Sequence, residues 1–385
     1  MPCTRESWRS PWDMYAALRD EDPVHHVEHG DYWVLSRFAD VFAAARDTEA
    51  FSSAQGLTFE YGEREKAGLS EADPMVMMDP PDHTAFRRLV GKGFTPRHVT
   101  EIEPAVRAFV VDRVERLRAQ GGGDLVAELF KPLPSFVVAY YLGVPEPDWP
   151  RFDGWTEGIV AASAEGDLFR ASDTVGELFA YFAELMERKR AEPGDDTISA
   201  LVQAGADTVT AMQVLGFAFT MVTGGNDTTT GLLGVSAELL TRFPAERARL
   251  LADPTLLDSA LEELLRLSAP VQGLARTPTR DIELHGRTIP AGRKVLLLYG
   301  AANRDPREFG PTAEDLDVGR SIKAILTFSY GAHHCLGAAA ARLMGRVALE
   351  ELLARCPDFA VDHEAGRFGP GHFVRRYESL PFVPA

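Results

Sequence analysis

The 385-residue sequence contains only three cysteines, Cys3, Cys335 and Cys356. Such sparse and irregular cysteines do not form a disulfide framework, and they are typical of proteins from a reducing compartment. Lys and Arg number 40 against 57 Asp and Glu, which leaves a formal net charge of −17. This deficit of positive charge argues against nucleic acid as a partner, because phosphate binding requires an excess of Lys and Arg.

The sequence also lacks a long hydrophobic run. Its most apolar stretch, residues 214–222, contains Thr220 and is followed by two glycines, so it is too short to span a bilayer. The first thirty residues mix positive and negative charges and resemble neither a signal peptide nor a membrane anchor. We therefore expect a cytoplasmic, water-soluble protein in which residues 1–385 form a single domain and act as a monomer.

Two groups of strand-forming residues lie far apart in the sequence. Val24–Val27 and Tyr32–Leu35 flank a turn and predict a hairpin, and a second group covers residues 282–299. Since small sheets need partner strands, we expect the early and late strands to pair. Helical periodicity appears at 101–119, 175–191, 209–242, 256–267 and 336–355. The sequence thus predicts a mainly α protein with a small β part.

The most informative segment begins at Phe328. Cys335 precedes a helix-forming run, and at a helix N-terminus the dipole and the free backbone N–H groups favour a thiolate. A thiolate is a suitable axial ligand for haem iron, and its electron donation favours O–O cleavage. Gly331 permits a turn that a side chain would resist, and Gly337 leaves room for a flat ring. His333, two residues before the cysteine, is placed to bind a carboxylate beside it.

Cys335 could in principle have a different role. Most lone cysteines are small buried hydrophobic residues, but the spacing Phe-x-x-Gly-x-His-x-Cys-x-Gly-x-x-x-Ala-Arg favours a ligand. A zinc site needs four ligands, and the sequence has no second cluster to supply them. A c-type haem needs Cys-x-x-Cys-His, which is absent.

The segment resembles the cysteine-ligand loop of the cytochromes P450, most closely that of soluble actinobacterial members. Further motifs follow the family's order, so the resemblance covers nearly the whole chain. It implies the triangular P450 fold and haem b as cofactor, with Cys335 as the metal ligand and Phe328, Gly331 and Gly337 against the haem. One departure is Ser329, where the family often has Gly; because Ser is small, we expect the fold to tolerate it.

A second motif, residues 224–229 (Gly-Gly-Asn-Asp-Thr-Thr), interrupts a long apolar helix. Two glycines there cost about 1 kcal/mol each relative to Ala, and the polar side chains compete for backbone hydrogen bonds and predict a local opening of the helix. Alone, the motif would suit a solvated helix face. The resemblance implies a groove for dioxygen at Gly224, with Asp227 relaying protons and Thr228 hydrogen-bonding at the oxygen site.

Several basic residues are candidates for holding the haem. A helix is predicted to start at Asp79-Pro80-Pro81, with Asp79 as its cap. His83 and Arg87 are four residues apart on it and therefore point the same way. The resemblance implies that both bind a haem propionate together with Arg276 and His333, although any one alone would suit a surface charge.

A further ionic motif is Glu263-x-x-Arg266, which places both side chains on one helix face. Without the resemblance it would be an ordinary surface pair. The resemblance implies a buried pair completed by Arg320, which stabilises the fold and does not act in catalysis.

Nothing in the sequence binds flavin, an iron–sulfur cluster or nicotinamide, so electrons must come from another protein. The resemblance implies a ferredoxin-type donor, which would dock on basic residues near the cysteine side of the haem. The candidates are Arg87, Arg88, Lys92, Arg97, Arg342 and Arg346, unless these are scattered solvated charges.

By the same resemblance, the expected reaction inserts one oxygen atom from O2 into a hydrophobic small molecule, by hydroxylation or epoxidation. Its pocket candidates, which would equally suit a plain core, are 52–74, Met75–Met78, 152–182, Phe217, Met221, Thr223, Gly273, Leu274, Phe373 and Val374. One alternative is a peroxide-driven peroxygenase, which Asp227-Thr228 argues against because such members carry Arg-Pro there. The other is a non-catalytic haem-binding or sensor protein, which usually carries an output domain.

Overall fold

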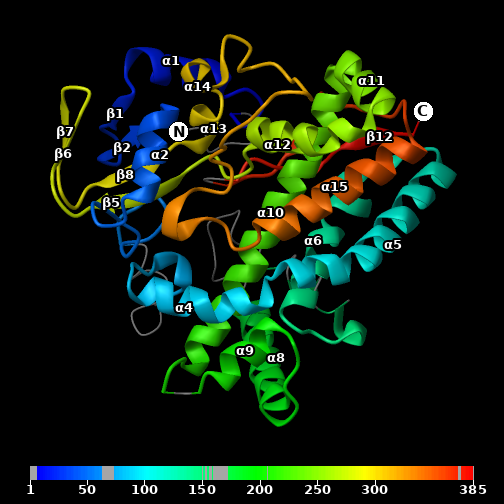
Figure 1. Ribbon diagram of the computed structural model, residues 1–385, viewed down its shortest axis with the longest axis horizontal. Helices are drawn as coiled ribbons and strands as arrows, with labels where there is room; N and C mark the ends of the chain where they lie inside the picture. Colours follow the sequence, from blue (N-terminus) through cyan, green and yellow to red (C-terminus); the bar gives the residue numbers. More distant parts are fainter. Residues whose placement is uncertain are drawn as a thin grey trace.

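The structure is a computed structural model that describes residues 7–62, 73–149, 151, 154–155, 158, 172–205, 207–371 and 374–384. Its outline is roughly triangular, broad across the strands and α5 (Pro96–Gln120) and narrowing towards α8 (Ser172–Ala191) and α9 (Thr197–Gln203) (Figure 1). Among the described residues, no helix is both long enough and apolar enough to cross a membrane.

Helix α10 (Ala211–Arg242) runs through the middle of the molecule (Figure 1). It begins with a capping box, in which the Thr210 side chain accepts from the Gln213 backbone and the Gln213 side chain accepts from the Thr210 backbone. Its C-terminal half is buried on nearly every side, which explains why this half is apolar around its whole circumference. Helices α6 (Pro132–Tyr141), α12 (Leu257–Ser268) and α15 (Ala338–Arg355) pack around it.

The predicted pairing of early and late strands is confirmed. One sheet has the order β1-β2-β8-β5-β3, with β1 at Val24–Val27, β2 at Tyr32–Leu35, β8 at Lys294–Leu297, β5 at Leu274–Pro278 and β3 at Phe51–Ser52. β2 pairs with β8 in parallel, so residues separated by more than 250 positions meet side by side. The strands β6 (Ile282–Leu284) and β7 (Arg287–Ile289) form a separate hairpin.

The remaining elements are short or lie around this framework. The helices are α1 Trp12–Glu21, α2 Phe38–Arg46, α4 Asp82–Val90, α11 Pro244–Ala252, α13 Tyr299–Ala302 and α14 Pro306–Phe309. The short helical turns are η1 Met75–Met77, η2 Gly91–Gly93, η3 Val126–Phe130, η4 Glu146–Asp148, η6 Pro254–Leu256 and η7 Gly331–His333. The other strands are β4 Gly123–Asp124, β9 Ala360–Val361, β10 Arg367–Phe368, β11 Tyr377–Ser379 and β12 Pro381–Val383.

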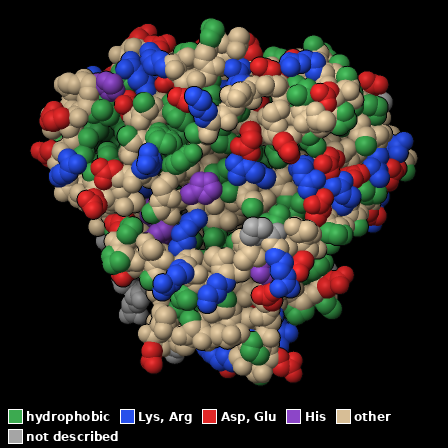
Figure 2. Space-filling model, in the orientation of Figure 1, with side chains coloured by type: hydrophobic (Ala, Val, Ile, Leu, Met, Phe, Trp, Pro, Cys, Tyr) green, Lys and Arg blue, Asp and Glu red, His purple; other side chains and the backbone are tan. Residues whose placement is uncertain are grey.

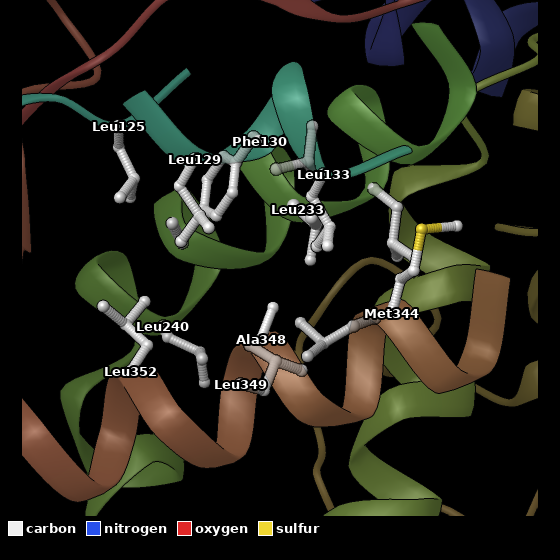
Figure 3. Close-up of a cluster of buried hydrophobic side chains, with 14 of the residues drawn as sticks. Leu125, Leu129, Phe130, Leu133, Leu233, Leu240, Met344, Ala348, Leu349 and Leu352 are labelled. Atoms are coloured by element: carbon white, nitrogen blue, oxygen red, sulfur yellow. The ribbon is translucent and has the colours of Figure 1, made fainter. Parts of the chain in front are cut away.

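The largest core lies where η3, α6, α10 and α15 meet (Figure 3). Leu129 and Phe130 of η3 belong to the same cluster as Leu233 and Leu240 of α10. Leu352 of α15 packs in this cluster as well. Each of these side chains is almost completely buried, which stabilises the fold by about 1.5–3 kcal/mol per side chain. This core fixes the position of α10 relative to the segment that precedes α15.

The start of α4 differs from the prediction. The helix begins at Asp82 after Pro81, and the Asp79 side chain does not cap it. Instead, the Asp79 carboxylate accepts the Ser53 backbone N–H at 2.8 Å and the Ser52 hydroxyl. Asp79 therefore ties the start of α4 to β3, because its side chain reaches across to that strand and away from its own helix.

The three charged residues Glu263, Arg266 and Arg320 form one buried network, as predicted. Arg266 donates to both carboxylate oxygens of Glu263 at 2.7 and 2.8 Å, and both side chains are 0% exposed. Arg320 donates to the same carboxylate at 3.0 Å. Arg266 also donates to the backbone carbonyls of Asn303 and Ala313, so the network anchors α12 to the segment that leads towards Cys335.

Replacing Glu263 with Gln should leave two buried guanidinium groups without a counter-charge. We expect Glu263→Gln to lower the free energy of unfolding by about 3–5 kcal/mol, the usual cost of breaking a buried ion pair. Urea unfolding and the haem content of the purified protein would measure this. Arg249→Gln, which breaks an exposed pair with Glu246 and Asp317, is the control and should change stability by less than about 1 kcal/mol.

Candidate haem site

Cys335 lies between η7 and α15, in a loop fixed by backbone contacts. Its backbone N–H donates to the carbonyl of Phe328 at 2.9 Å, which closes the loop that the two residues delimit. Gly331 has φ of 70°, and a Cβ there would lie 3.0 Å from the Ala45 carbonyl oxygen at the end of α2. The turn at Gly331 therefore requires glycine both for its conformation and for its close packing.

The environment of Cys335 does not by itself favour a thiolate. The residue is exposed, but desolvation of the sulfur by the surrounding protein raises the pKa of its thiol. The Gly337 backbone N–H and the positive charges of Arg87 and Arg342 oppose the shift without cancelling it. The Gly337 backbone N–H, at the start of α15, thus acts in the predicted direction, towards the thiolate.

A cluster of basic side chains lies close to Cys335. On the face shown in Figure 2, His side chains and Lys or Arg side chains lie together near the middle. His83 is 1% exposed, and neither of its ring nitrogens has a hydrogen-bond partner in the described part of the chain. Its ring centroid lies 4.2 Å from that of His333, and the charges of Arg87 and Arg276 act on both rings. The structure thus brings His83, Arg87, Arg276 and His333 together.

The charge of this cluster comes from the arginines. Burial is the main cause that lowers the pKa of His83 and brings the pKa of His333 to about 3, and the neighbouring Arg276 and Arg87 lower both further. Neither Arg87, which is half-buried, nor Arg276, which is buried, forms an ion pair with an Asp or Glu among the described residues. Two such guanidinium groups, and a buried imidazole whose nitrogens accept or donate no hydrogen bond among the described residues, suit an anionic ligand such as the two propionates of haem.

The motif on α10 is also positioned to line a site. The helix is continuous from Ala211 to Arg242, so the predicted local opening is wrong. The Thr228 hydroxyl donates to the Gly224 carbonyl at 2.8 Å, which satisfies it within the helix. A Cβ at Gly224 would meet nothing within 4 Å, whereas one at Gly225 would lie 2.7 Å from Val138 of α6. Gly224 therefore faces open space, while Gly225 allows the two helices to pack closely.

Asp227 has a partner that the sequence did not predict. Its carboxylate pairs with the Arg376 guanidinium at 2.7 Å. Burial raises the pKa of Asp227, and the charges of Arg376 and Lys131 oppose that shift. No local pattern in the sequence links these two residues, because 149 positions separate them and Arg376 lies in an irregular segment near the C-terminus.

Some pocket candidates are closely packed against other parts of the chain. Phe217 is 2% exposed and belongs to a buried hydrophobic cluster, and a Cβ on Gly273 would lie 2.8 Å from the Leu297 carbonyl oxygen. Val374 forms an isolated β-bridge with Val271. Met221 and Leu336, the residue after Cys335, pack against the same cluster as Phe217, which connects α10 to the cysteine loop. Residues 63–72, 152–153, 156–157, 159–171 and Phe373 lie outside the described residues.

Comparison with known proteins agrees with this geometry. The family model for cytochrome P450 matches residues 235–364. The chain is 61% identical to cytochrome P450 130 of Mycobacterium tuberculosis, over 98% of this chain and 96% of that protein. It is 37% identical to vitamin D(3) 25-hydroxylase of Pseudonocardia autotrophica, over 92% of this chain and 88% of that protein. A Mycobacterium marinum cytochrome P450, CYP268A2, solved in complex with pseudoionone, superposes with a TM-score of 0.89 at 34% identity, covering 100% of this chain and 98% of that chain.

The fold and these similarities define a haem protein of the cytochrome P450 class. The chain belongs to the cytochrome P450 family and is a haem monooxygenase. The predicted fold class is confirmed, and the cofactor is haem b, iron protoporphyrin IX, held through a cysteine thiolate.

Removing one of the two unpaired arginines should weaken haem retention. We expect Arg276→Gln to lose a charged hydrogen bond worth about 1.5–3 kcal/mol, which corresponds to a roughly 10- to 100-fold higher dissociation constant. The rate of haem transfer to an excess of an apo-globin would measure this. Arg280→Gln, at an exposed position shortly after β5, is the control, and equal transfer rates for both variants would contradict the assignment.

Proposed function

We propose that this P450 inserts one oxygen atom from O2 into a hydrophobic small organic molecule, by hydroxylation or epoxidation, with electrons from a ferredoxin and its reductase. The observation that carries the proposal is the acid–alcohol pair Asp227-Thr228 on a helix that faces open space at Gly224. The hydrophobic substrate class is supported by two relatives, one named a vitamin D(3) hydroxylase and one solved with pseudoionone. We also propose that the protein acts as a monomer in the cytoplasm.

Each side chain has a distinct part in this proposal. Cys335 supplies the thiolate ligand, with Phe328, Gly331 and Gly337 shaping the loop around it. His83, Arg87, Arg276 and His333 hold the propionates. Bound haem supplies the iron that binds and activates O2.

On the opposite side of the site, we assign proton transfer to Asp227 and Thr228. The Asp227 side chain is 21% exposed and ionisable, so it can exchange a proton between solvent and the interior. The Thr228 hydroxyl, now satisfied by the Gly224 carbonyl, can turn to hydrogen-bond a group in the open space beside that glycine.

The ferredoxin would dock on the face that carries Cys335, but fewer charges are free there than the sequence suggested. Arg342 forms two hydrogen bonds with Glu262 and its guanidinium lies over the Phe328 ring, so it supports the cysteine loop. Arg346 and Arg97 are likewise paired with glutamates. Arg88 and Lys92 are exposed and form no ion pair among the described residues, so they are the better candidates for contact with an acidic protein.

Thr228→Ala should uncouple the consumption of NAD(P)H from product formation. Because one hydrogen bond at the oxygen site is lost, worth about 1.4 kcal/mol, we expect product per NAD(P)H to fall about tenfold while reduction of the protein continues. Thr220→Ala on the same helix removes a matched hydroxyl, which donates to the Gly216 carbonyl, and should keep parental coupling. Parental coupling in Thr228→Ala would remove the role assigned to Thr228.

Reversing both free charges, as Arg88→Glu with Lys92→Glu, should slow reduction by the ferredoxin. We expect at least a roughly tenfold slower rate at low salt, and a smaller difference as salt screens the attraction. Stopped-flow reduction would measure this, with Arg280→Glu as the control. The absorption spectrum should stay unchanged, because neither residue lies in the haem cluster. A reduction rate unaffected at every salt concentration would place the docking surface elsewhere.

Hydrogen peroxide separates the proposal from the peroxygenase alternative. A monooxygenase that relies on Asp227 and Thr228 should form product with NAD(P)H, ferredoxin and O2 far faster than with peroxide alone. Product formation that is faster with peroxide and indifferent to the ferredoxin would favour a peroxygenase.

A further inference from the structure

Arg376 reaches Asp227 from the C-terminal part of the chain, and the fold makes specific room for it. The guanidinium pairs with the Asp227 carboxylate at 2.7 Å, and Arg376 is only 7% exposed. A largely buried ion pair that joins two distant segments is costly to desolvate, so the surroundings must hold both partners in place.

The first structural feature that holds Asp227 and Arg376 in place is Gly231. It lies one helical turn after Asp227, and therefore on the same side of α10. A Cβ at Gly231 would lie 2.7 Å from the Arg375 carbonyl oxygen and 3.5 Å from the Arg376 Cβ. The Arg375 backbone N–H donates to the Pro270 carbonyl at 2.8 Å, which fixes the segment there. The absence of a side chain at Gly231 thus lets the C-terminal segment lie directly against the helix.

The second feature is Gly369. A Cβ at this position would clash with the Arg376 guanidinium, so the guanidinium lies against bare backbone. The Gly369 backbone N–H donates to the Arg376 carbonyl at 2.9 Å, which holds the two residues opposite each other. Two glycines on different elements therefore define the position of a single side chain.

The charges that face Asp227 come from two elements. Arg376 approaches from the C-terminal segment, and Lys131 from the junction of η3 and α6. Burial of the carboxyl acts against its ionised form, and these two cations act in its favour. Arg376 is the one in direct contact, so its removal should alter Asp227 most.

We propose that Arg376 is a positioning residue of the proton relay, which holds the Asp227 carboxylate ionised and in one orientation against the C-terminal segment. The proposal rests on the proposed function, in which Asp227 relays protons. In this proposal Arg376 acts through its contact with the Asp227 carboxylate. Its effect reaches the oxygen site only through Asp227.

Infrared spectroscopy of the holoenzyme tests the contact without measuring turnover. The C=O stretch of protonated Asp227, identified by its loss in Asp227→Asn, should disappear with rising pH at one midpoint. Arg376→Gln should raise that midpoint by at least about one pH unit, a tenfold change in the proton equilibrium. Arg376→Lys should restore most of the difference. An unchanged midpoint in Arg376→Gln would overturn the inference.

A second variant covers the case in which Arg376→Gln does not fold. Gly369→Ala keeps every charge but pushes the guanidinium away from its place, so it should raise the midpoint in the same direction. Arg242→Gln is the matched control, because it breaks a different ion pair on α10, with Glu238, and should leave the midpoint unchanged. A midpoint unmoved in Gly369→Ala, or moved equally in Arg242→Gln, would count against a specific role of Arg376.

Coupling measurements distinguish the failure of this inference from failure of the proposed function. Asp227→Asn should lower product per NAD(P)H and change the solvent isotope effect, and Arg376→Gln should shift the pH profile of coupling upward. If Asp227→Asn behaves like the parent, the relay itself is wrong. If Asp227→Asn is impaired but Arg376→Gln moves neither the infrared midpoint nor the pH profile, only the role of Arg376 is wrong.

Discussion

The structure depends on the position of one residue, Cys335, in the loop that leads into α15. Burial raises the pKa of Cys335, and the Gly337 N–H, Arg87 and Arg342 together do not reverse that shift. A metal cation bound to the sulfur would favour the thiolate, because a cysteine binds a metal in its ionised form. The close packing of Gly331 against α2 and the stacking of Arg342 on Phe328 hold the loop in shape. These contacts fix the position of the Cys335 sulfur ahead of α15.

The charged residues of the structure differ in whether they have a partner of opposite charge. The buried network of Glu263, Arg266 and Arg320 is internally neutralised and serves the fold. The guanidinium groups of Arg87 and Arg276 have no carboxylate partner among the described residues, which suits an anionic ligand such as a haem propionate. Exposed cations that could attract a redox partner are few, because most arginines of this face are paired with glutamates. Among the described residues of this protein, whose formal net charge is −17, exposed Lys and Arg side chains without an ion-pair partner are therefore few on this face.

Much of this could be predicted from the sequence, because local patterns carry it. The spacing around Cys335, the early hairpin, the course of α10 and the Glu263 network depend on residues whose spacing fixes their side of an element. What was missed depends on tertiary contacts. The Asp227–Arg376 pair, the Glu262 partner of Arg342 and the Glu103 partner of Arg346 involve residues that are distant in sequence. Asp79 was misassigned as a cap because its carboxylate has a better partner in β3 than in its own helix. Ser329 adopts φ of 55°, so its backbone conformation, beyond the size of its side chain, explains why glycine suits this position.

The most direct test is the absorption spectrum of the reduced, CO-bound protein, compared between the parent and Cys335→His. The parent should show its Soret band at the long wavelength typical of thiolate ligation. Cys335→His should lose that band, with any retained haem absorbing at the shorter wavelength of histidine ligation. A parent spectrum at the histidine position, or a thiolate band that survives in Cys335→His, would contradict the assignment of Cys335 as the iron ligand.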